Sequence, residues 1–219
     1  MASSGIPSVP ADVVVNCPRC GSQVKRSMQN VNGTLYRCAG CEWQFTPGNV
    51  TVGAAPGVPS SGNATTNLVT NNKGSIIIVT LSGFTLTFVY VNGVQAGTTN
   101  AAYAVPAGGT ISVTYSVAGT WTWLLPTNSS GVSAGATAIP IAAGGASFAS
   151  GEQLYFSDGA ASEIVVVGPG STGTSIALQG AGFANAHGSG KSFGDLVLTP
   201  AYSNPGVGEA VPAAAGWGF

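Results

Sequence analysis

Charged residues are so scarce in this chain that they limit the folds open to it. Six basic and seven acidic residues are spread over 219 positions, which is 6% of the chain, against about 25% in an average soluble domain. The residues that fill solvent-facing helix positions are therefore few, whereas Gly, Val, Thr and Ser are plentiful. We expect an all-β chain, and a hydrophobic fraction of 44% supplies enough apolar mass for a core.

The same composition argues against several classes of protein. A net charge of −1 with ordinary hydrophobicity argues against global disorder, and the absence of a basic surplus argues against a large nucleic-acid-binding surface. No uncharged apolar run reaches 18 residues, so no membrane span is expected, and residues 1–11 lack the features of a secretory signal. A surface with so little charge is typical of a protein whose surface is largely covered by binding partners.

The cysteines predict a metal site. Two C-x-x-C pairs, separated by 17 residues, match the spacing of a structural zinc site, and the four ligands are Cys17, Cys20, Cys38 and Cys41. Gly21 suits the left-handed turn that follows such a pair. Four thiolates close the coordination shell of Zn²⁺, so the ion is expected to stabilise the fold and not to catalyse. A disulfide framework is the alternative.

The cysteines bracket a segment that resembles a zinc ribbon over residues 12–47. Strands are expected at 24–29, 33–37 and 42–45, with an Asn-Gly hairpin turn at 30–33. About 35 residues bury too little core alone, so the ion would supply much of the folding free energy. A nucleic-acid-binding role is an open alternative, because basic and aromatic residues gather here: Arg19, Lys25, Arg26, Arg37, Tyr36 and Trp43.

The rest of the chain divides into two expected β modules and two connecting segments. A Pro/Gly-rich stretch over 48–74 predicts a flexible or extended linker. Short strands at close spacing predict a first sandwich or open barrel over 75–128, with a hairpin at Asn92-Gly93. A second module is expected over 135–200, with a hairpin at Asp158-Gly159. Residues 201–219 form an extended tail that contains Trp217 and Phe219, which either bind a partner's pocket or have no binding role.

Aromatic residues of the first module allow two interpretations. Trp121 and Trp123 alternate on one strand and so share a face, which favours core anchors. The alternative is that they form, with Tyr115, a carbohydrate platform of an adhesion module.

No catalytic constellation is evident. The one histidine, His187, could complete a Ser-His-Asp triad only with Asp12, Asp158 or Asp195, and no nucleophile elbow supports such a triad. Gly188-Ser189-Gly190-Lys191-Ser192 resembles the end of a P-loop, but Asn185 stands where the motif requires Gly. Three carboxylates near one hairpin could pair as an acid and a base, but solvated hairpin charges are the simpler interpretation: Glu152, Asp158 and Glu163. We predict that the chain is not an enzyme.

The β modules resemble structural proteins of tailed bacteriophage virions. The resemblance rests on Tyr103–Ser116 with the following Trp121-Thr122-Trp123, and on Ser150–Phe156 continuing to Glu163–Val167, which look like the Gly/Thr-rich, charge-poor modules of capsid decoration and minor head or tail proteins. It implies a non-enzymatic capsid decoration or cement protein that binds and bridges major capsid subunits in the virion. It also implies repeated weak contacts and a symmetric homo-oligomer such as a trimer. Minor tail or adhesion proteins are the alternative class.

Overall fold

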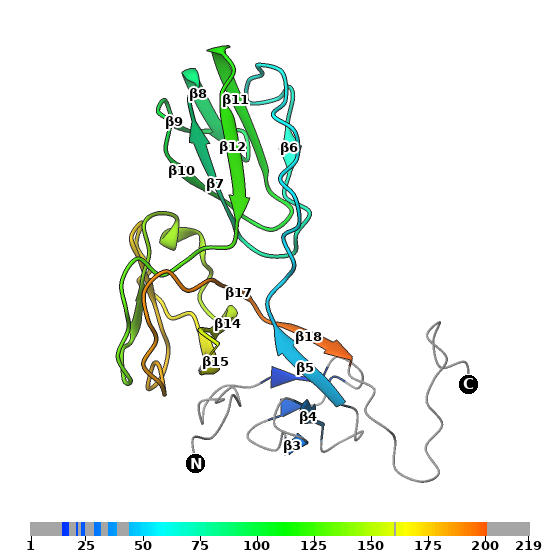
Figure 1. The fold of residues 1–219 in the computed structure, drawn as a ribbon, viewed down its shortest axis with the longest axis vertical. Coiled ribbons are helices and arrows are strands. Elements are labelled where there is room, and N and C mark those ends of the chain that lie inside the picture. Colours follow the sequence, from blue (N-terminus) through cyan, green and yellow to red (C-terminus); the bar gives the residue numbers. More distant parts are fainter. Residues whose placement is uncertain are drawn as a thin grey trace, which may run out of the picture.

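The computed structural model describes residues 15–17, 21, 23–24, 29–31, 35–38, 44–159 and 161–200. These residues confirm the all-β expectation, since they form strands, one short 3₁₀ turn at Gly145–Ser147 and no α-helix. Figure 1 shows the strands in three groups, with the first module at the top, the second at the lower left and a smaller sheet at the lower right. No helix with the length and apolar character to cross a membrane occurs in the described ranges.

The cysteine-containing region contributes short strands. β1 (Val15–Asn16) pairs with β2 (Gln23–Val24), and β3 (Gln29–Val31) pairs with β4 (Leu35–Arg37). The second pairing includes Asn30 and Val31, so the strand continues beyond Asn30, where the turn was expected to begin. β4 also pairs with β5 (Gln44–Gly48).

The fourth strand of this sheet comes from the far end of the chain. β18 (Val197–Pro200) runs antiparallel to β5, which gives the order β18-β5-β4-β3. The sequence placed residues 196–198 in the second module, and Leu196 and Leu198 do pack there against Ile164. β18 therefore joins the small sheet to the second module through both backbone and side chains.

The first module contains two sheets of a small sandwich. One has the order β10-β7-β12 and the other β6-β11-β8-β9. The strands are β6 (Val69–Thr70), β7 (Ile77–Ser82), β8 (Thr85–Val91), β9 (Val94–Gly97), β10 (Ala102–Val105), β11 (Thr110–Val117) and β12 (Thr120–Leu124). The β8–β9 hairpin turns at Asn92-Gly93 as predicted, with φ of 52° and 76°, the left-handed conformation of a type I′ turn.

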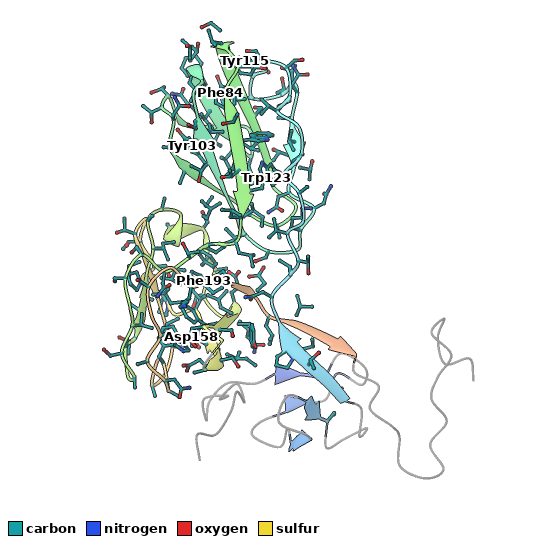
Figure 2. All side chains as sticks on the ribbon, viewed as in Figure 1. Phe84, Tyr103, Tyr115, Trp123, Asp158 and Phe193 are labelled. Atoms are coloured by element: carbon teal, nitrogen blue, oxygen red, sulfur yellow. The ribbon has the colours of Figure 1, made fainter. Side chains whose placement is uncertain are left out.

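Alternating side chains build the core of this sandwich. On β12, Trp121 and Trp123 are buried while Thr120, Thr122 and Leu124 are exposed. The two indoles contact edge to face, with ring centroids 5.5 Å apart, and pack with Val79 and Val113 from the two sheets. Figure 2 places Trp123 toward the second module and Tyr115 near the opposite end of the sandwich. The prediction that both tryptophans anchor the core is confirmed.

The segment expected to be a flexible linker lies against the first module. β6 pairs with β11, and the Gly62 amide donates to the Val113 carbonyl at 2.9 Å. Two core aromatics donate to its carbonyls, Trp121 Nε1 to Pro56 at 2.8 Å and Tyr115 Oη to Pro59 at 2.7 Å. We call residues 49–74 the connector. Its prolines do favour an extended chain, but partners on the sandwich fix that chain in place, which local composition did not indicate.

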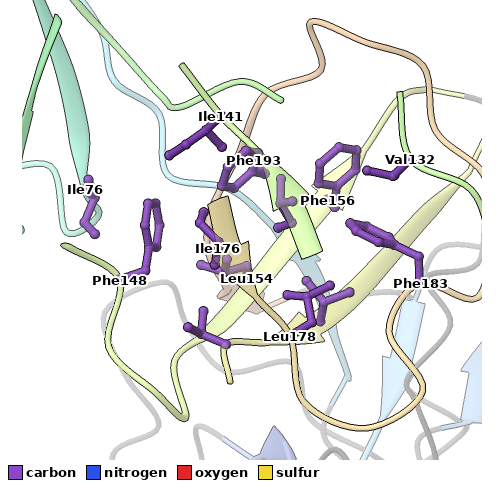
Figure 3. Close-up of a cluster of buried hydrophobic side chains, with 13 residues drawn as sticks. Ile76, Val132, Ile141, Phe148, Leu154, Phe156, Ile176, Leu178, Phe183 and Phe193 are labelled. Carbon is purple, nitrogen blue, oxygen red and sulfur yellow. The ribbon is translucent and has the colours of Figure 1, made fainter. Parts of the chain in front are cut away.

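The second module is less regular. Its strands are β13 (Ala138–Pro140), β14 (Gln153–Ser157), β15 (Ser162–Val166), β16 (Ser175–Ala177) and β17 (Phe193–Asp195). They form a β13-β16 pair and a β15-β14-β17 sheet. Figure 3 shows side chains from both sheets and from the loops meeting in one core, including Phe148, Phe156, Phe183 and Phe193. The Asp158-Gly159 hairpin forms as expected, with Ser157 opposite Ser162.

Candidate functional site

The structure describes only half of the predicted zinc site. Cys17 follows β1 and Cys38 follows β4, and both side chains are buried, at 2% and 0% exposure. The Gly21 amide donates to the Cys17 carbonyl at 2.9 Å, and Gly21 has the expected positive φ of 68°. This is the tight turn that lets a C-x-x-C pair present two sulfurs to one ion. Cys20 and Cys41 lie outside the described residues.

A second cluster is formed by His187 and two carboxylates. His187 Nε2 lies 2.6 Å from Glu163 Oε1, and Nδ1 lies 3.2 Å from Asp158 Oδ2. The first contact is a hydrogen bond, whereas the second has an ion-pair distance without hydrogen-bond geometry. The imidazole is fully buried beside Phe156 and Phe183, with ring centroids 4.7 and 5.4 Å away. Figure 2 shows Asp158 in the lower part of this module.

Glu163 is the centre of this cluster. The Ala184 amide donates to Oε2 at 2.6 Å, and the Asn185 amide donates to Oε1 at 3.0 Å. The side chain is 0% exposed. Both oxygens accept N–H groups, which is the arrangement that satisfies a buried carboxylate. The interpretation of Glu163 as a solvated hairpin charge was therefore wrong, because the 183–187 loop folds over the hairpin and buries it.

The geometry gives this cluster a structural role. One histidine nitrogen contacts Glu163 and the other faces Asp158, so neither nitrogen is presented to a substrate, as general-base catalysis requires. Of the triad partners considered from the sequence, Asp158 does reach His187, whereas Asp195 lies on β17 beside Glu152 and Asp12 lies outside the described residues. The arrangement joins the β14–β15 hairpin to the 183–187 loop.

Glu152 pairs with a different carboxyl group. It precedes β14, at the opposite end of that strand from Asp158. Burial and the neighbouring Asp195 carboxyl raise the pKa of Glu152 to about 8, although the Ala149 amide, which donates to Oε2 at 2.8 Å, lowers it. At neutral pH the Glu152 carboxyl is therefore mostly protonated. The three carboxylates that the sequence grouped do not form one site.

The resemblance to a P-loop has no structural counterpart. His187 bridges to Val132 and Ser192 bridges to Thr127, and the chain then enters β17. A P-loop requires a helix whose N-terminus faces the phosphate. The loop is held instead by the buried Asn128, whose Oδ1 accepts from the Lys191 amide at 2.7 Å and whose Nδ2 donates to Gly188 at 2.7 Å.

The first module has an unusual surface. Residues 49–126 include one charged residue, Lys73. The outer face of the β10-β7-β12 sheet is partly open, with exposed Thr80, Ser82, Thr120, Thr122 and Leu124. Leu124 is 61% exposed. Such a face combines hydroxyl and apolar groups without any formal charge.

Sequence reasoning missed the buried polar residues that hold the loops. Asn71 is fully buried, and its Nδ2 donates to the carbonyls of Ser75 and Val105 at 2.8 Å each. Asn128 and Glu163 act in the same way in the second module. An Asn between turn residues is common in exposed loops, so the local sequence contained no signal that separates these residues from surface ones.

The structure describes some of the remaining residues that the sequence singled out. Arg37 and Tyr36 lie on β4, whereas Arg19, Lys25, Arg26 and Trp43 lie outside the described residues, as do Trp217 and Phe219. The tryptophans proposed as a glycan platform are buried at 7% and 2% exposure, so they do not form such a platform.

Comparison with family models, curated proteins and solved structures finds no match to this chain.

Proposed function

We propose that this chain is a non-enzymatic structural protein of a virus particle, a capsid decoration or cement protein that binds and bridges major capsid subunits. The observation that carries the proposal is the uncharged surface of the first module. Residues 49–126 contain Lys73 as their one formal charge, and the outer face of the β10-β7-β12 sheet exposes Thr, Ser and Leu side chains beside the part that the 141–145 chain covers.

The physical basis is the cost of desolvation. Covering charged groups in an interface costs several kcal/mol per ion unless each is paired, whereas hydroxyl groups can exchange water for a partner's backbone and apolar groups gain from burial. A flat uncharged face is therefore suited to permanent coverage by a neighbouring subunit.

Open sheet edges add to this argument. In the order β6-β11-β8-β9, the edge strand β9 has exposed Val94, Gln95 and Ala96. Unpaired backbone groups of such an edge can accept a strand from a lattice subunit. Weak contacts of this kind are multiplied over many copies on a particle, and a symmetric homo-oligomer such as a trimer fits a lattice three-fold axis.

The N-terminal region contributes a structural zinc ion in this proposal, bound by Cys17, Cys20, Cys38 and Cys41. Its support is the burial of Cys17 and Cys38 and the left-handed Gly21 turn after the first pair. When bound, the ion supplies folding free energy to a segment with little core. Because all four ligands are protein thiolates, it offers no open position to a substrate.

Density-gradient fractionation tests the virion role. Particles from cells that produce this chain are separated from soluble protein, and an antibody to the chain is used to follow it. We expect the chain in the particle peak, in many copies relative to the most abundant shell protein. Recovery only in the soluble fractions, while intact particles band normally without it, would contradict the proposal.

A glycan-binding adhesion role is the second candidate, supported by a different aromatic pair. Side chains alternate along β8, and Val89 and Val91 pack into the core. Phe88 and Tyr90 therefore point away from the core. Their ring centroids are 5.9 Å apart, and Gln95 lies opposite Tyr90. Loss of binding to neutral oligosaccharides in Tyr90→Ala, with an unchanged melting temperature, would favour this candidate.

A further inference from the structure

An apolar groove lies where the first module meets the second. Its walls come from the outer face of the β10-β7-β12 sheet and from the chain after β13, and they include Ile78, Leu124, Pro126 and Ile141, with Thr80 and Thr127 as polar members. None of the lining residues carries a charge. Figure 1 shows this junction at the lower end of β12.

The groove has a fixed shape because the two modules touch beside it. Ile78 lies between Ala104 and Leu124 on adjacent strands. Gly144 approaches this row so closely that a Cβ there would collide with the Ala104 side chain. Gly144 also has a φ of 84°, which a residue with a side chain adopts only with strain. The 141–145 chain is thus held against the sheet by a position that requires glycine.

The groove is open to a ligand. Leu124 is 61% exposed at its rim, although a leucine side chain gains roughly 1.5–3 kcal/mol from full burial. The part of a ligand that enters this groove must be apolar and uncharged, because a charge placed against these walls would lose hydration without gaining a partner.

The chain itself contains such a ligand. Residues 201–219 follow β18 and include one charged residue, Glu209, among Ala, Pro and Gly, together with Trp217 and Phe219. Nineteen residues can span up to about 60 Å when extended. Aromatic side chains that fill a neighbour's apolar pocket are the usual anchors of protein interfaces.

The direction of β18 indicates which copy receives this segment. Figure 1 shows β18 running away from β12 and from the second module, and its last residue, Pro200, pairs with Phe45 of β5. The described chain therefore ends on the side away from its own groove, which favours the groove of another copy as the binding site of the segment that follows.

We propose that residues 201–219 of one copy bind in the apolar groove of a second copy, with Trp217 or Phe219 as the anchor against Leu124 and Ile141. This contact is heterologous, so it links copies head to tail into a ring or an open chain. The inference concerns self-association and does not depend on the proposed virion role.

Site-specific photocrosslinking of the full-length purified chain tests this contact. The photoreactive residue p-benzoylphenylalanine replaces Trp217, and mass spectrometry maps the crosslinks formed on irradiation. We expect products of dimer mass or larger, with crosslinks at the groove residues Ile78, Leu124 or Ile141. Irradiation of a mixture of isotopically light and heavy chains identifies crosslinks between copies.

Two variants complete the test. Leu124→Asp places a charge at the rim and should reduce the yield of crosslinked dimer by about tenfold or more, which corresponds to about 1.4 kcal/mol. Val94→Asp, at a valine on β9 that is even more exposed (70%) than Leu124, should leave the yield unchanged. Crosslinks that map outside the groove, crosslinks confined within one chain, or equal yields from the two variants would each overturn the proposal.

Discussion

At the scale of single residues, the second module depends on polar side chains in its interior. Glu163, His187 and Asn128 are 0%, 4% and 1% exposed, and between them they hold the loops at 128–130 and 183–191. Buried polar groups stabilise a fold only when their hydrogen bonds are complete. A module with strands of three to five residues has few backbone hydrogen bonds between its strands. Hydrogen bonds from buried polar side chains therefore supply part of its stability.

Removal of the imidazole should show this dependence. His187→Ala leaves Glu163 buried without its imidazole partner, and we expect a loss of roughly 3–5 kcal/mol in the free energy of unfolding of the second module. Urea denaturation followed by Phe and Tyr signals of this module measures the change. Ser189→Ala, on the exposed part of the same loop, should change stability by less than about 0.5 kcal/mol. Equal effects of the two substitutions would refute the structural role of His187.

The Glu152–Asp195 pair should make stability depend on pH. The pKa of Glu152 is raised from 4.5 to about 8 in the folded chain, so the folded state retains a proton that the unfolded state releases. Stability is therefore greatest below pH 4.5 for this group and falls as the pH rises to about 8. Because Glu152 is only half-buried, solvent screening reduces the effect to the order of 1 kcal/mol.

Glu152→Gln should remove this dependence. The amide can still donate a hydrogen bond to Asp195, but it does not ionise, so we expect a higher melting temperature than wild type at pH 8 and a smaller difference at pH 5. Thermal unfolding across that range provides the measurement. Lys191→Gln, which changes one charge in the same module, should keep the wild-type slope, and a wild-type slope in Glu152→Gln itself would show that the pair does not titrate as described.

At the scale of elements, the connector contributes to the first module. It supplies β6 to the four-stranded sheet, and its carbonyls accept from Trp121 and Tyr115. The outer face of β11 is covered in the same way, since Ser112 and Thr114 donate hydroxyl hydrogen bonds to Asn63 and Gly62 carbonyls. The sandwich therefore extends from residue 49 and not from 75.

Tyr115→Phe tests the contribution of the connector. The substitution removes the hydrogen bond to the Pro59 carbonyl and should cost about 1 kcal/mol of stability. Amide hydrogen exchange should become faster over residues 60–66. Tyr90→Phe is the matched control, because the Tyr90 hydroxyl makes no hydrogen bond within the described part of the chain. If exchange over 60–66 stays at the wild-type rate, the connector is held by other contacts.

At the scale of the whole molecule, β18 connects units that are far apart in sequence. It pairs with β5 beside the cysteine region, while Leu196 and Leu198 pack on Ile164 of the second module. Changes in the cysteine region are therefore expected to reach the second module through this strand.

Metal removal tests that organisation. We expect one zinc ion per chain by elemental analysis. A chelator should increase hydrogen exchange across residues 12–47 and over β18, while the cores of both modules stay protected. A metal-free chain with two disulfides would contradict the zinc proposal, and loss of protection throughout the modules would contradict their independence.

Much of the fold could be predicted from the sequence because it depends on local patterns. Alternation of polar and aromatic residues predicts which face of β12 is buried, and Asn92-Gly93 predicts a hairpin because few other residue pairs accept two positive φ angles. The scarcity of charge determined both the all-β character and the uncharged surface of the first module.

Tertiary structure alone decided the contacts between distant segments. The burial of Glu163 against His187, the pairing of Glu152 with Asp195, the position of the connector and the addition of β18 to β5 all join residues that are separated by 24 or more positions or lie in different modules. Such contacts depend on how the modules close on one another. The composition of one segment indicates its own backbone preference. It does not indicate which distant segment will pack against it.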